Sequence, residues 1–112
     1  MNIENAEISS TFLGYEDHGI FTFSIGLEGD GWGVGFGGIA LDGYDIKKDE
    51  RVPDSKAVSV LTEILKVVGV NKWEDLKGKT VRVENNGLGR PVKKIGNLIK
   101  NDWLDLEEYF KD

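Results

Sequence analysis

The chain has 112 residues, a formal net charge of −6 at pH 7 and no cysteine. Its length fits a single domain over residues 1–112, and its 39% hydrophobic content is typical of a folded protein. The absence of cysteine excludes disulfides, thiol nucleophiles and cysteine-based zinc sites, while the acidity disfavours binding to nucleic acid or to anionic membranes. Because residues 1–12 contain neither a basic region nor a long apolar run, we expect no signal peptide and a cytoplasmic location.

Three segments before residue 42 show the alternation of half-buried strands. Residues 2–12 place apolar side chains between polar ones, with an expected break near Ser9 and Ser10. Residues 20–27 alternate clearly, and the four residues that follow favour a hairpin turn because Asp-Gly tolerates positive φ. Residues 32–41 then complete an expected antiparallel meander.

The third of these segments contains an unusual run, in which glycine takes every second position from Gly31 to Gly37. In a strand, this pattern leaves one face bare and places Trp32, Val34 and Phe36 on the other. The run also matches the glycine spacing of a phosphate loop, but the strand pattern continues through it instead of opening a helix. The bare face therefore receives either the protein's own helix or a partner.

The middle of the chain has the strongest helix pattern. Asp54 or Ser55 can cap the first turn, apolar residues recur at helical spacing as far as Val68, and Gly69 suits the left-handed position beyond the last turn. We expect this helix to pack on the sheet and to supply most of the core. Residues 42–53, which precede it, are predicted to form a polar connection.

The C-terminal part alternates short elements and completes an α+β fold. We expect an antiparallel sheet of about five strands, with one main helix packed on it and short helical turns near the middle and the C-terminus. First comes a helical turn with Asn71 and Glu74 as a capping pair. Strands over 79–84 and 91–99 follow, joined by a tight turn at 85–87, and the second of them has a bulge at Gly96. In the terminal segment, Trp103 opens a helical turn that Asp105 caps.

The sequence offers little that indicates catalysis. The single histidine, His18, lies in a polar loop without a clear orienting partner. Asp45, Asp49 and Glu50 gather in the connection over 42–53, but their spacing differs from that of a calcium loop and basic residues are interleaved with them. We therefore expect no enzyme, no cofactor and no bound metal.

Five residues are the candidate binding residues. Trp32 lies beside a turn and is suited to anchor an interface, and Phe36 follows it along the same face of the strand. Asp45, Asp49 and Glu50 lie in the long connection, a kind of segment that often carries binding sites. The net charge favours a partner with a basic surface, and a homodimer remains open.

Three stretches together carry a resemblance: AEISSTFLGYEDHG at 6–19, KWEDLKGK at 72–79 and KIGNLI at 94–99. They resemble a group of short proteins of unassigned function encoded in bacteriophages and prophages, and the resemblance covers most of the chain. It implies a small accessory protein made in the cytosol of an infected bacterium. It brings no known activity or functional residue.

Two functions follow as hypotheses. The first is a non-catalytic phage accessory protein that binds a host or phage protein. One form of this function is the inhibition of a bacterial defence system, as anti-CRISPR proteins do. The alternative is a small-ligand or nucleotide-binding module, in which a ligand lies on the bare glycine strand and Trp32 or Phe36 stacks on it.

Overall fold

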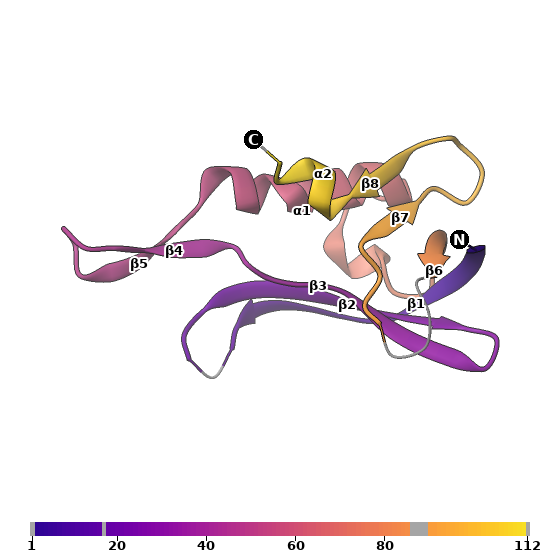
Figure 1. The fold of residues 1–112 in the computed structure, drawn as a ribbon, viewed down its shortest axis with the longest axis horizontal. Coiled ribbons are helices and arrows are strands. Elements are labelled where there is room, and N and C mark those ends of the chain that lie inside the picture. Colours follow the sequence, from indigo (N-terminus) through magenta and orange to yellow (C-terminus); the bar gives the residue numbers. More distant parts are fainter. Residues whose placement is uncertain (1, 17, 86–89, 112) are drawn as a thin grey trace.

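The computed structural model of this chain describes residues 2–16, 18–85 and 90–111. Helices α1 and α2 lie on one side of the strands β1, β2 and β3 (Figure 1). We call the sheet face turned toward α1 the inner face and the opposite one the outer face. The elements are β1 (Asn2–Tyr15), β2 (Phe21–Gly29), β3 (Trp32–Ala40), β4 (Asp42–Asp45), β5 (Glu50–Pro53), α1 (Ser55–Val68), the 3₁₀ helix η1 (Trp73–Asp75), β6 (Thr80–Asn85), β7 (Lys94–Gly96), β8 (Trp103–Asp105) and α2 (Leu106–Tyr109).

The main sheet has six strands in the order β3-β2-β1-β6-β7-β8, and all neighbours are antiparallel. The predicted α+β class is confirmed, with one strand more than the sequence indicated. The additional strand is β8, because Trp103 lies in a strand rather than opening a helical turn. Asp105 caps α2 as predicted, accepting hydrogen bonds from the backbone amides of Glu107 and Glu108.

The predicted meander is confirmed, including its irregularity. The pairing of β1 with β2 shifts register between Ile8 and Ser10, where the sequence indicated a break. The turn between β2 and β3 contains Gly31 at φ 78°, which is the positive φ that Asp-Gly favours. Phe23, Ile25 and Leu27 of β2 point inward and are almost completely buried.

Helix α1 begins and ends as the sequence predicts. Asp54 accepts a hydrogen bond of 2.9 Å from the Ala57 amide. At the other end, Gly69 has φ 89°, and the amides of Gly69 and Val70 both donate to the Leu65 carbonyl. The buried side chains of α1 pack into the core together with the inner face of the sheet; they are Ala57, Val60, Ile64 and Val67.

Three further local predictions in the C-terminal part are wrong. Helix η1 begins after Lys72 without a side-chain cap, so the predicted capping pair does not form. Gly96 is in register with both neighbouring strands and is not a bulge. The predicted strand over 91–99 is reduced to β7, because Val92 instead bridges in parallel to Phe36 of β3 and donates to the Gly35 carbonyl at 3.0 Å. Most of the predicted tight turn at 85–87 lies outside the described residues.

The predicted polar connection over 42–53 is also wrong, because this segment is a two-stranded hairpin of β4 and β5. We call this hairpin, Asp42–Pro53, the arm. The carboxylate of Asp45 stabilises the turn at the tip of the arm, because it accepts hydrogen bonds from the amides of Lys47 at 2.9 Å and Lys48 at 3.3 Å. The arm extends away from the sheet and helices (Figure 1).

The bare face of the glycine-rich strand is the outer face. Gly33 and Gly35 are exposed there, whereas Trp32 and Val34 are partly buried against the core on the inner side. Phe36 is 1% exposed. The protein's own helix therefore packs on the opposite side from the glycines.

Candidate functional site

A charged pair at the base of the arm, Asp42 and Arg51, is hydrogen-bonded to the body. The carboxylate Oδ1 of Asp42 accepts hydrogen bonds from Nε of Arg51 at 3.0 Å and from its Nη2 at 2.7 Å. The other oxygen, Oδ2, accepts from the Phe21 amide at 3.1 Å, which joins the arm to the first residue of β2. The hydrogen bonds from Arg51 lower the pKa of Asp42 in spite of the opposing effect of desolvation, and the carboxylate raises the pKa of Arg51.

The tip of the arm exposes apolar side chains. Ile46 is 85% exposed and Tyr44 is 55% exposed. The hydroxyl of Tyr44 donates to the carboxylate of Asp49, a residue held at φ 52°. Because Asp45 and Asp49 both bond within the arm, the tip has a defined shape that presents Ile46 to solvent.

The structure brings together three of the five candidate binding residues. Asp45, Asp49 and Glu50 lie together near the tip of the arm. The other two lie on β3, where the Trp32 indole covers Gly29 of the neighbouring strand and the Phe36 ring is buried. Neither ring faces the bare glycine surface.

Sequence reasoning missed Tyr44 and Ile46. Both lie in a stretch that is otherwise rich in charge, and such a composition predicts a solvated connection. The signal for an ordered element is the pair of large apolar residues on both sides of Asp45, because solvated loops consist mainly of polar residues.

A second group of exposed apolar side chains lies near the base of the arm. Leu13 is 39% exposed and Tyr15 is 70% exposed, at the end of β1. The Tyr15 ring lies 5.2 Å from that of Phe21, whose amide bonds to the arm through Asp42. The end of β1 and the arm project from the same end of the molecule (Figure 1).

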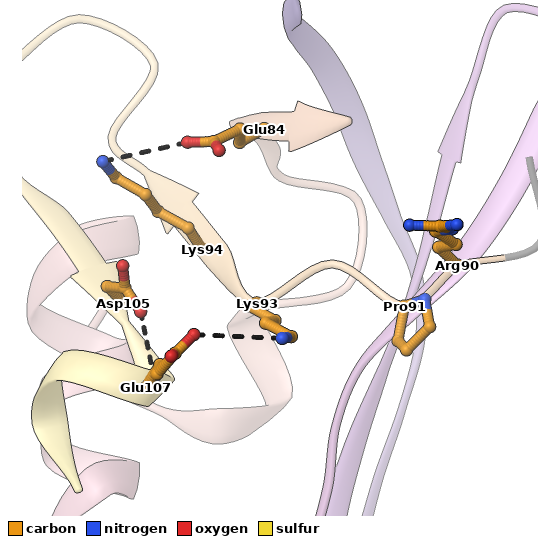
Figure 2. A pocket seen from close by; sticks show the side chains of 7 residues that line it. All are labelled: Glu84, Arg90, Pro91, Lys93, Lys94, Asp105 and Glu107. Atoms are coloured by element: carbon orange, nitrogen blue, oxygen red, sulfur yellow. Dashed lines mark hydrogen bonds and ion pairs between the residues drawn. The ribbon is translucent and has the colours of Figure 1, made fainter. Parts of the chain in front are cut away.

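A cleft of about 420 Å³ lies between β6, β7 and α2. Four of its charged groups form two ion pairs: Lys93 Nζ lies 3.8 Å from Glu107 and Lys94 Nζ lies 4.0 Å from Glu84. Figure 2 shows the two lysine side chains pointing to different sides, with Arg90 set apart from both. Both lysines therefore have an acidic partner in the cleft.

The single histidine, His18, lies in the segment between β1 and β2. His18 lies on the rim of a hollow of about 560 Å³ beside Phe12 and Tyr15, and it makes no hydrogen bond to another described residue. Within residues 2–16, 18–85 and 90–111, no three His, Asp or Glu side chains gather as metal ligands. In the same part of the chain, neither helix has the length and apolar character needed to cross a membrane.

Comparison of the chain with protein-family models, with curated proteins and with solved structures finds no match.

Proposed function

We propose that this protein is a binding module that docks on another protein through the arm, without catalysing a reaction. The observation that carries the proposal is Ile46, which is 85% exposed at the end of a hairpin that projects from the body. Apolar side chains that are held in solvent on an ordered support are favourable anchors for an interface, because binding removes them from water at little cost in ordering.

The hydrogen bonds within the arm support the same conclusion. An isolated two-stranded hairpin is at best marginally stable in water. Here Asp45 bonds the turn and the Tyr44 hydroxyl bonds Asp49 across the hairpin, so the tip is ordered without being packed on the core. An ordered tip favours recognition of a partner, because less conformational freedom is lost on binding. The tip does not contribute to the packing of the core.

The partner we propose is a host or phage protein in an infected bacterium, following the resemblance in sequence to phage-encoded proteins. Inhibition of a bacterial defence system through such binding is one form of this function. The net charge of −6 supports a partner with a basic surface.

The alternative of a small ligand on the glycine strand has less support. It requires an aromatic ring that can stack on a ligand lying on the outer face. Trp32 covers Gly29 and Phe36 is buried, so both rings are engaged within the protein. Protein binding through the arm is therefore the better supported function.

Site-specific photo-crosslinking in bacterial cells tests this proposal. A photo-crosslinking amino acid replaces Ile46 in one protein and Ile99 in a matched control, since Ile99 is 87% exposed in the loop before β8. We expect a discrete crosslinked species from position 46 that is absent from position 99. No species at position 46, or the same species at both positions, contradicts docking through the arm.

Binding measurements with the purified partner then give the size of the effect. Ile46→Asp should weaken the affinity by about tenfold or more, the effect of an anchor that contributes at least 1.4 kcal/mol. Ile99→Asp should bind like the unmodified protein.

A further inference from the structure

The arm leaves the body at Leu41, between β3 and β4, and returns to it at Asp54, between β5 and α1. At its base, the Leu41 amide donates to the Phe21 carbonyl at 2.7 Å and the Asp54 amide donates to the Leu41 carbonyl at 2.9 Å. Leu41 is completely buried. These bonds fix the points where the chain enters and leaves the arm, but they lie outside the hairpin itself.

Within the hairpin, Asp42 is the residue that joins three strands. Its carboxylate binds the Phe21 amide of β2 and the guanidinium of Arg51 on β5, while its own backbone belongs to β4. Nη2 of Arg51 also donates to the Asp42 carbonyl at 3.1 Å. A planar guanidinium that makes several hydrogen bonds to one residue fixes orientation as well as distance.

The environment of this pair makes it sensitive to change. The Asp42 side chain is 4% exposed and that of Arg51 is 32% exposed. A buried carboxylate that loses its cationic partner remains desolvated without compensation, so its surroundings must rearrange. Ile46 lies at the end of the hairpin opposite Asp42. A change of angle at the base therefore displaces Ile46 more than it displaces the residues next to Asp42.

The geometry points to Asp42 and Arg51 as a latch that holds the arm in one direction relative to the body, so that the tip reaches its partner already oriented. This inference rests on the proposed function of the arm, but the order of the arm is a property of the free protein. It names two positioning residues that need not touch the partner.

The absence of cysteine allows a direct test in the free protein. Spin labels are attached at Ile46→Cys on the tip and at Ser59→Cys on the exposed surface of α1, and double electron–electron resonance gives the distribution of distances between them. We expect one narrow distribution with the latch intact. Asp42→Asn and Arg51→Lys should each broaden it, since the first removes the charge and the second removes the planar fork.

A matched control removes a different ion pair. Lys66→Met eliminates the contact of 3.2 Å between Lys66 and Glu63 on the surface of α1 and should leave the distance distribution unchanged. Circular dichroism of every labelled protein verifies the fold, and Arg51→Lys, which retains the charge, keeps the test valid should Asp42→Asn unfold. A distribution that stays narrow in Arg51→Lys overturns the latch.

The two proposals fail in distinguishable ways. A narrow distribution in the latch variants together with crosslinking at position 46 rejects the latch and retains docking through the arm. Broadening in these variants without crosslinking at position 46 supports the latch and rejects the proposed function.

Discussion

The indole of Trp103 occupies the space in which a side chain at Gly96 would stand. The two residues are directly opposite each other in β7 and β8, and a Cβ added at Gly96 would lie 2.6 Å from the ring. The guanidinium of Arg82 lies 4.8 Å from the centre of the same ring, and Lys94 Nζ lies 5.1 Å from it. Glycine is therefore required at position 96 by the neighbouring strand.

Gly96→Ala should consequently destabilise the protein. Because the new methyl group displaces the Trp103 indole, we expect a loss of about 1–3 kcal/mol in the free energy of unfolding, measured in urea. Gly43→Ala is the matched control, since nothing lies within 4 Å of a Cβ at that strand position. Equal stability of the two variants would contradict the packing of Trp103 on Gly96.

Substitution of the glycines of β3 should also affect stability according to the space around each of them. A Cβ at Gly35 would meet nothing closer than the Ile25 carbonyl oxygen at 4.0 Å, whereas one at Gly37 would lie 2.5 Å from the Phe23 ring on a backbone with φ 99°. Gly37→Ala should lose about 1–3 kcal/mol, while Gly35→Ala should be neutral or gain about 0.5 kcal/mol by restricting the unfolded chain. Thermal denaturation of both variants measures the difference, and a large loss in Gly35→Ala would show that the outer face is covered.

Features of the fold that depend on local sequence alone were predictable, whereas those that depend on distant contacts were not. The ends of α1 depend on Asp54 and Gly69, whose effects are local, and both were predictable. The inward alternation of β2 was predictable because the period of a strand is independent of its partners. The strand β8 was not predictable, because Trp103 pairs with Gly96 across a loop and no local pattern marks such a pairing.

The candidate site was predictable only in part. Asp45, Asp49 and Glu50 are close in sequence, so any compact arrangement of residues 42–53 brings them together. The arm itself depends on the pair of Asp42 and Arg51 and on a backbone amide of β2, which are contacts that composition does not reveal. Phe36 is a candidate binding residue on the sequence alone, because alternation defines two faces of a strand without indicating which of them is buried.

Ile46→Asp should separate binding from folding. Because Ile46 is 85% exposed, the free energy of unfolding should stay within about 0.5 kcal/mol of the original value. Ile64→Ala is the opposite case, since Ile64 is 0% exposed in α1 and its truncation should cost about 2–5 kcal/mol. Urea denaturation measures both, and a marked loss of stability in Ile46→Asp would mean that the tip of the arm packs on the body.

The contribution of Asp42 to stability should depend on pH in a defined direction. Hydrogen bonds from Arg51 hold the pKa of Asp42 below its ordinary value of 3.8 in the folded protein. A carboxyl group with a lowered pKa stabilises the fold fully at pH values well above the unfolded pKa, and this stabilisation is lost as the pH falls through the folded pKa. Arg51 stays charged throughout this range, because the hydrogen bond to the Asp42 carboxylate raises its pKa above the ordinary value of an arginine.

Comparison of the unmodified protein with Asp42→Asn tests this dependence. The difference in the free energy of unfolding should be constant above about pH 5 and should shrink as the pH falls through 3.8 and below, because the carboxyl group of the unmodified protein then becomes neutral as well. Urea titrations between pH 7 and pH 3 provide the measurement. A difference that grows toward low pH would require a raised pKa for Asp42 and would contradict its pairing with Arg51.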